Sequence, residues 1–303
     1  MRLLKISNIK NIYEARTLAE QGVDFIGLHL VTRDHLERIP VFQQINRMLA
    51  NEFPQTKSIL VTKERSIERI IELIRSTGCQ GIELHYPPVP GLFAMLRSYF
   101  GKSLIIMGVT SPVISPRPNE FLLSNYVIVN KNYVGGTGER IPYPTIQHMA
   151  ELYKDQNVML AGGIDLDAIR KLRVVSHISG YDIQTAVISD NLDTFENIDR
   201  KKAIEIVQAV KGKNSSVKSL KPPKMHVANL NQDLEPMFNK FHFFKFEIDP
   251  TNYNKDLKNI KEFAKLNSHL VIEVNIESDL LEETKKALKG SADKIKQLTV
   301  VSN

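Results

Sequence analysis

Short apolar runs alternate with amphipathic stretches along roughly the first 210 residues of the chain. The apolar runs lie at 3–6, 24–30, 58–61, 81–85, 103–108, 126–129, 158–160 and 178–183. A buried strand followed by a helix is the repeating unit of parallel sheets. Eight such units at nearly even spacing within about 210 residues predict a (β/α)8 TIM barrel. A doubly wound open sheet is the alternative, and the even spacing favours closure.

Helices are predicted between these runs, with one exception. The predicted helices lie at 11–21, 41–50, 66–76, 92–100, 143–153, 165–173 and 199–211. Between Ser111 and Leu123, however, Pro112, Pro116 and Pro118 disfavour a helix, because proline lacks the backbone N–H that a helix requires. The fifth strand is therefore expected to connect to the sixth without a helix.

A polar, proline-ended segment at 212–223 predicts a linker after the barrel, which would occupy residues 1–211. Beyond it, β-like runs at 225–230, 242–248, 269–276 and 297–301, with helical patterns at 255–266 and 279–289, predict a small α/β domain over 224–303. The aromatic run 241–246 fits a core strand better than a base-stacking platform. No chemical motif in this domain indicates its role.

Composition excludes several classes of protein. In a chain of 303 residues, 42% apolar and 24% charged content is typical of a soluble globular protein. No apolar run approaches the ~18 residues of a membrane span, and no signal peptide is evident. The net charge of +6 fits solvated lysines, because no dense basic run is interleaved with aromatics. With a single cysteine, Cys79, we expect a cytoplasmic protein without an internal disulfide, cofactor, metal, membrane or nucleic-acid partner.

Two glycine loops follow predicted buried strands. One contains Gly135, Gly136, Thr137 and Gly138, and the other contains Gly162 and Gly163. Glycine allows the backbone to approach a ligand and to point amide N–H groups at it, as phosphate oxygens require. Because barrel active sites lie at the carboxyl ends of the strands, the two loops predict a phosphate-binding site at the barrel mouth.

Polar side chains end other predicted strands and form a candidate ligand site. They are Lys5, Ser7 and Asn8 in the first strand, Glu83 and His85 in the fourth, Asn130 in the sixth, and Asp182 and Gln184 in the eighth. Glu83 and His85 are two residues apart and so lie on one face of their strand. A ligand site is favoured for the whole set, and a structural ion-pair network of Lys5, Glu83 and His85 is the alternative.

Five blocks, in order, resemble the phosphoribosylanthranilate isomerase family of tryptophan biosynthesis. They are Lys5-Ile-Ser-Asn-Ile9, Gly22-Val-Asp-Phe-Ile-Gly27, Glu83-Leu-His85, Gly135-Gly-Thr-Gly138 and Leu160-Ala-Gly-Gly-Ile164. The resemblance covers residues 1 to about 211 and includes Tyr181-Asp182-Ile183. The missing fifth helix is likewise similar to that family, whereas residues 220–303 have no counterpart there.

The resemblance implies an Amadori rearrangement, in which a ribosylamine opens and an aminoaldose becomes an aminoketose. In the family, a cysteine in the first strand is the general base and an aspartate after the sixth strand is the general acid. Ser7 and Asn130 stand at these positions. A serine hydroxyl is a poor base near neutral pH unless another group takes its proton, and an amide cannot donate a proton as a carboxylic acid does. The two substitutions argue against the family reaction.

Other departures from the family pattern accompany these two. Asn8 replaces a glycine, Glu83 replaces a glutamine, and the loop after the eighth strand reads Gln184-Thr-Ala-Val-Ile188. The family's substrate-binding arginine has no clean match, with Arg38 and Arg33 both near, and Arg38 is the one we predict. Lys5, His85 and Asp182 are retained, and we predict that Lys5 and Asp182 bind substrate.

Three hypotheses follow for the function. The favoured one is a diverged isomerase-like enzyme acting on a phosphorylated sugar-derived molecule, with Glu83 and His85 as its acid–base pair. The second is a pseudoenzyme that binds a phosphorylated metabolite and uses the C-terminal domain as an output or protein-partner surface. The third is a genuine phosphoribosylanthranilate isomerase, which Ser7 and Asn130 disfavour.

Overall fold

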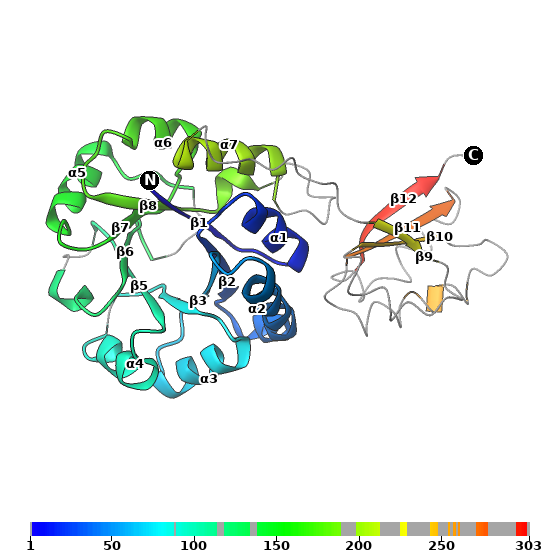
Figure 1. The fold of residues 1–303 in the computed structure, drawn as a ribbon, viewed down its shortest axis with the longest axis horizontal. Coiled ribbons are helices and arrows are strands. Elements are labelled where there is room, and N and C mark those ends of the chain that lie inside the picture. The colour runs from blue at the N-terminus through cyan, green and yellow to red at the C-terminus, as the bar shows by residue number, and fades with distance from the viewer. Residues whose placement is uncertain are drawn as a thin grey trace. The chain divides into compact units, whose positions relative to one another are not determined.

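A computed structural model describes most of the first 212 residues and four strands beyond them (Figure 1). The described residues are 2–87, 89–113, 118–133, 138–188, 198–212, 225–228, 243–247, 254, 257, 258, 260, 271–277 and 295–301. The chain divides into two compact units, one with the strands of the barrel and one with the C-terminal strands. Each unit is described by itself.

The first unit is a closed barrel of eight parallel strands in sequence order. The strands are β1 (Leu3–Ser7), β2 (Phe25–Leu30), β3 (Lys57–Thr62), β4 (Gly81–Leu84), β5 (Ile105–Thr110), β6 (Tyr126–Val129), β7 (Val158–Leu160) and β8 (Ile178–Ile183). The ring closes where β1 pairs with β8, with Lys5 beside Asp182. The predicted (β/α)8 barrel is confirmed.

Seven α-helices among the described residues lie outside the ring of strands (Figure 1). They are α1 (Ile12–Glu20), α2 (Ile39–Glu52), α3 (Ile67–Thr77), α4 (Leu92–Phe100), α5 (Tyr143–Leu152), α6 (Leu166–Leu172) and α7 (Arg200–Lys211). α3 shows how the sequence sets their limits: the Ser66 hydroxyl caps its first turn by accepting from Arg69 N, and Gly78 ends it in the left-handed conformation. None of the helices that the structure describes is long and apolar enough to cross a membrane.

The interior of the barrel is filled by side chains from the strands. One buried cluster consists of Phe25, Ile59, Met107, Val109, Ile128, Met159 and Ala161. These side chains make the barrel a packed core rather than a pore. Because these side chains fill the interior, a ligand site is expected beyond them, at the carboxyl ends of the strands.

The connection between β5 and β6 contains a single 3₁₀ turn, η2 (Pro118–Phe121), and no α-helix among its described residues. The Phe121 ring is 2% exposed and lies 6.1 Å from the Phe93 ring and 5.7 Å from the Tyr153 ring, between centroids. It also covers Gly108 of β5, where an added Cβ would lie 2.6 Å from the Phe121 ring. Phe121 thus takes the place of a helix in covering this strand.

The second unit contains a four-stranded, all-parallel sheet in the order β12-β11-β10-β9. Its strands are β9 (Met225–Ala228), β10 (Phe243–Glu247), β11 (Val271–Glu277) and β12 (Ile295–Val301). The predicted strands are therefore present. Most of the predicted helices, at 255–266 and 279–289, and nearly all of the linker at 212–223 lie outside the described residues, so the domain boundaries stay predictions.

Replacing Phe121 with alanine should lower the free energy of unfolding of the barrel by about 3–5 kcal/mol, the usual cost of deleting a buried aromatic ring. The neighbouring Leu122, which is 69% exposed, provides the control, and Leu122→Ala should change stability by less than about 0.5 kcal/mol. Urea denaturation of the full chain, followed by circular dichroism, measures both. Equal effects of the two variants would contradict the covering role of Phe121.

Candidate active site

A cavity of about 140 Å³ opens at the carboxyl ends of the strands. Most of the residues predicted for the site line it: Ser7, Glu83, His85, Asn130, Gly138, Gly162, Gly163, Asp182 and Gln184. The barrel therefore brings together side chains from β1, β4 and β8 with the loops that follow β6 and β7. This set could be predicted from the sequence, because the parallel strands of a barrel all have their carboxyl ends at one face.

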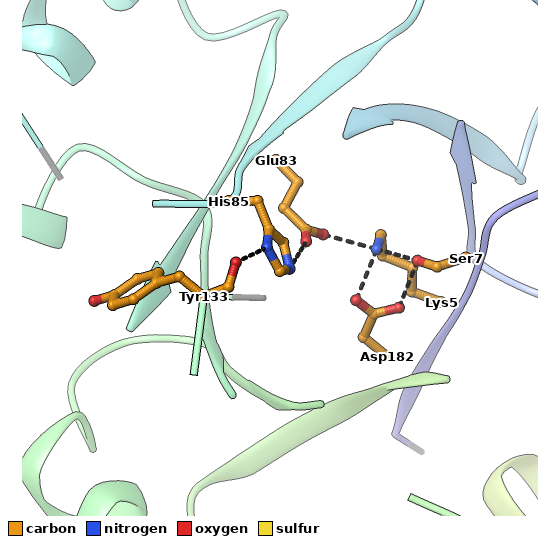
Figure 2. Close-up of polar contacts among 6 residues, drawn as sticks. All are labelled: Lys5, Ser7, Glu83, His85, Tyr133 and Asp182. Atoms are coloured by element: carbon orange, nitrogen blue, oxygen red, sulfur yellow. Dashed lines mark hydrogen bonds and ion pairs between the residues drawn. The ribbon is translucent and has the colours of Figure 1, made fainter. Parts of the chain in front are cut away.

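Lys5 lies at the centre of a buried polar network (Figure 2). Its ammonium nitrogen Nζ donates to Ser7 Oγ at 2.5 Å and to Asp182 Oδ2 at 2.8 Å. Nζ also forms an ion pair with Glu83, whose Oε2 lies 2.7 Å away. Lys5 is 0% exposed and does not line the cavity. In this geometry it holds its three neighbours in place rather than reaching a ligand.

Burial alone would lower the pKa of the Lys5 ammonium, because an apolar environment disfavours charge. The carboxylates of Asp182 and Glu83 outweigh this effect and raise the pKa above its ordinary value. Lys5 is therefore protonated throughout the neutral range. The contacts of Lys5 on β1 therefore connect β8, which carries Asp182, with β4, which carries Glu83 and lies four strands from β8 in the ring.

Ser7 is held from two sides. Its hydroxyl accepts from Lys5 Nζ and donates to Asp182 Oδ1 at 2.8 Å. Gly27 on β2 pairs with Ser7 and makes room for it, because a Cβ at position 27 would lie 2.5 Å from Ser7 Oγ. The proton of the Ser7 hydroxyl thus points to a carboxylate that can accept it.

His85 faces both the cavity and Glu83 (Figure 2). Its Nδ1 lies 2.8 Å from the Tyr133 carbonyl oxygen, which can only accept, so Nδ1 carries a hydrogen. Nε2 lies 3.6 Å from Glu83 Oε1, beyond hydrogen-bond distance. The pair combines an imidazole with a carboxylate, the combination that proton transfer requires.

Two asparagines follow strands of the barrel: the conformation of the backbone suits Asn8, and the side chain of Asn130 lies beside Gly162. Asn8 has φ 68°, in the left-handed region that glycine and asparagine adopt most readily. An asparagine can therefore replace a glycine here without a change of backbone. Asn130 is 7% exposed at the end of β6, and its Oδ1 lies 2.8 Å from the place of an added Cβ at Gly162.

The glycine loops after β6 and β7 touch each other at the cavity. Gly138, Gly162 and Gly163 all have positive φ, and a Cβ at Gly163 would lie 2.4 Å from Gly138 O. The amides of these glycines and of Ile164 donate no hydrogen bond to any residue within the described ranges. Within the described part of the chain they are donors available to an anion. Gly135, Gly136 and Thr137 lie outside the described residues, so their part in phosphate binding stays a prediction.

The predicted arginine is not placed in the cavity. Arg38 ends the 3₁₀ turn η1 (Arg33–Arg38), is half-buried and does not line the cavity. Only the backbone of Arg33 is described. The cavity is instead lined by His29, Lys63 and Thr185, which the sequence reasoning missed. His29 lies within β2 and Lys63 directly follows β3, so a search of every strand end for polar residues would have found Lys63.

No group of three or more His, Cys, Asp or Glu side chains among the described residues is arranged to hold a metal ion.

Lys5→Met should destabilise the barrel by about 3–5 kcal/mol at pH 7, because it leaves the buried Glu83 and the partly buried Asp182 without their cation. The loss should shrink at acid pH, where protonated carboxyls need no counter-charge. In the wild type, the raised Lys5 pKa means that the lysine's contribution is full below its ordinary pKa and is lost only as the pH rises above it. Denaturation of both proteins across pH measures this.

Lys154→Met is the control for the loss of a lysine, because Lys154 pairs with Glu151 at the exposed surface. Its effect on stability should be negligible at all pH values, since exposed ion pairs contribute little. A Lys5→Met variant as stable as this control would contradict the proposed role of Lys5.

A sequence model of the family N-(5'phosphoribosyl)anthranilate (PRA) isomerase matches residues 4–198. The N-(5'-phosphoribosyl)anthranilate isomerase of Methanothermobacter marburgensis is 29% identical over 171 residues, which are 52% of this chain and 75% of that protein. The enzyme of the same name from Chlamydia trachomatis serovar L2 is 24% identical over 187 residues, 61% of this chain and 86% of that protein.

Solved structures share the fold. Phosphoribosyl anthranilate isomerase from Thermus thermophilus superposes with a TM-score of 0.56 at 16% identity, covering 70% of this chain and 98% of that one. A phosphoribosyl anthranilate isomerase in complex with reduced 1-(o-carboxyphenylamino)-1-deoxyribulose 5-phosphate has a TM-score of 0.52 at 14% identity, covering 70% of this chain and all of that one.

Proposed function

Since this chain belongs to the N-(5'-phosphoribosyl)anthranilate isomerase family, we propose that its barrel is a diverged isomerase-like enzyme acting on a phosphorylated, sugar-derived small molecule. The observation that carries the proposal is one cavity in which glycine-loop amides, with no hydrogen-bond acceptor among the described residues, meet the Glu83–His85 pair. Amides of this kind suit a phosphate group. A phosphorylated sugar derivative, reduced 1-(o-carboxyphenylamino)-1-deoxyribulose 5-phosphate, is also what the phosphoribosyl anthranilate isomerase complex contains.

In this proposal, His85 moves the proton that an aldose–ketose isomerisation transfers between neighbouring carbons. The Tyr133 carbonyl holds the hydrogen on Nδ1 and leaves the Nε2 lone pair facing the cavity. Nε2 takes the proton from the carbon next to the carbonyl, and the adjacent Glu83 carboxylate stabilises the imidazolium. The hydroxyl proton of the substrate passes to the former carbonyl oxygen, and the imidazolium returns the carbon-bound proton to the former carbonyl carbon, so that the aldose becomes the ketose with no net gain or loss of protons. Ser7 and Asn130 bind substrate oxygens without transferring protons.

A binding protein without turnover is the second candidate. It is favoured by the two-sided hydrogen bonding of Ser7 and by an amide at Asn130, neither of which provides an acid or a base. In either case we propose a small-molecule ligand rather than a nucleic acid, and a cytoplasmic location. A protein partner for the C-terminal domain is part of the second candidate alone.

The phosphate site can be tested at Gly138, where an added Cβ meets no atom within 4 Å. Aspartate and asparagine both tolerate the left-handed φ of 67° found there. Gly138→Asp should weaken binding of inorganic phosphate at least tenfold, since like charges about 4 Å apart repel by roughly 4 kcal/mol near a protein surface. Gly138→Asn, of the same shape, should keep affinity within about threefold.

Isothermal titration of phosphate into the three proteins measures the difference. Gly163 is a poorer place for the same test, because any side chain there would collide with Gly138 O. If Gly138→Asp binds phosphate as well as the wild type does, the phosphate does not lie at these loops.

The altered acid–base positions can be tested by restoring them. Ser7→Cys combined with Asn130→Asp should produce measurable isomerisation of N-(5'-phosphoribosyl)anthranilate, and neither single change should do much, because the reaction needs an acid and a base. Each such group typically contributes about 10²–10⁴-fold, so the double variant should exceed the product of the single gains. A wild-type protein that already turns over this substrate at an ordinary rate would show that Ser7 and Asn130 are not disabling.

A further inference from the structure

We infer that the ligand carries a positively charged amine, which lies against Glu83 and Asp182, so that the site takes phosphorylated aliphatic amines such as amino sugar phosphates. The inference rests on the proposed function, because it assumes that the phosphate of the ligand lies at the glycine loops. The observation behind the inference is that the barrel mouth holds more carboxylates than buried cations.

The buried network holds two carboxylates and one cation. Asp182 and Glu83 both pair with Lys5, at 2.8 and 2.7 Å, and Lys5 is completely buried. With all three groups ionised, one negative charge remains. Among the described residues that line the cavity, the only lysine or arginine is Lys63, an exposed residue at the rim. The floor of the cavity is therefore anionic.

The uncompensated charge has a specific location. Glu83 Oε2 lies 2.7 Å from Lys5 Nζ, whereas Oε1 lies 3.6 Å from His85 Nε2 and accepts no hydrogen bond from the described residues. The Glu83 side chain is only 2% exposed and lines the cavity, so the carboxylate is largely shielded from bulk water. Buried carboxylates are costly unless a cation or several hydrogen bonds compensate them. Glu83 Oε1 is thus a built acceptor at the wall of the cavity.

The chemistry of the ligand follows from what Glu83 Oε1 lacks. A hydroxyl group would supply a hydrogen bond but no charge, and an arylamine is uncharged near neutral pH. An alkylammonium supplies both charge and up to three hydrogens, enough for Glu83 Oε1 and the cavity side of Asp182 together. His29 and His85 also line the cavity, and the aliphatic ammonium differs from them in carrying a fixed positive charge near neutral pH.

Matched pairs of phosphate esters test the inference with the full-length protein. Glucosamine 6-phosphate and glucose 6-phosphate differ by an ammonium in place of a hydroxyl, and 2-aminoethyl phosphate and 2-hydroxyethyl phosphate form a second pair with another spacing. In at least one pair, the amine should bind about tenfold tighter, a difference of roughly 1.4 kcal/mol. The affinity of each member of a pair is measured by calorimetry or by competition against a phosphate reporter.

Glu83→Gln should reduce this preference to within about threefold, because the amide keeps the shape and removes the charge. Inorganic phosphate should bind both proteins alike, since the glycine loops follow other strands. Glu139→Gln is the control, because Glu139 is a carboxylate outside the cavity that pairs with Lys131, and it should keep the preference. If Glu83→Gln does not fold, the ratio of amine to hydroxyl affinity in the wild-type protein tests the inference by itself.

The outcomes separate the inference from the proposed function. A protein that binds inorganic phosphate but shows no amine preference in either pair overturns the inference and leaves the phosphate site standing. A preference that survives Glu83→Gln also overturns it, since the charge would then come from elsewhere. Failure to bind inorganic phosphate at all overturns the proposed function itself.

Discussion

The buried ammonium of Lys5 is the interaction on which the barrel mouth depends. Register places Lys5 beside Asp182 where β1 and β8 close the ring, and its side chain reaches Glu83 on β4 across the interior. Two carboxylates this deep in a protein are sustainable only with a cation between them. The same contacts orient Ser7, and the cavity beside this network is also lined by Glu83, His85 and Asn130.

Most of the fold could be predicted from the sequence, because apolar strands and amphipathic helices are local patterns. The predicted limits of β6, β7, β8 and α4 agree with the structure. The prediction for β5 began and ended two residues early, since Gly108 was read as the end of the strand. In the structure Gly108 lies within β5 and makes room for the Phe121 ring. That requirement arises from a long-range contact, which a local pattern does not contain.

The sequence predicted which residues form the site better than it predicted how they are arranged. The rule that barrel sites lie at strand ends found Ser7, Glu83 and Asp182. It could not show that Lys5 would be enclosed by its partners, because that depends on the closure of β1 against β8 and on the reach of Glu83 across the ring. Arg38 could not be placed either, since the direction of a side chain on a 3₁₀ turn is set by packing that sequence spacing does not describe.

The backbone requirements of the mouth and its proton chemistry are separable in this chain. Asn8 keeps the left-handed conformation that a glycine would also adopt, Gly27 keeps the space that the residue at position 7 needs, and Gly162 and Gly163 keep their positive φ. These features shape a cavity and present amides whichever acid or base is present. Because each would be strained or blocked by most other residues, their joint presence beside Ser7 indicates a mouth still shaped to hold a ligand. In the proposed enzyme, proton transfer relies on Glu83 in β4 and on His85, which directly follows that strand.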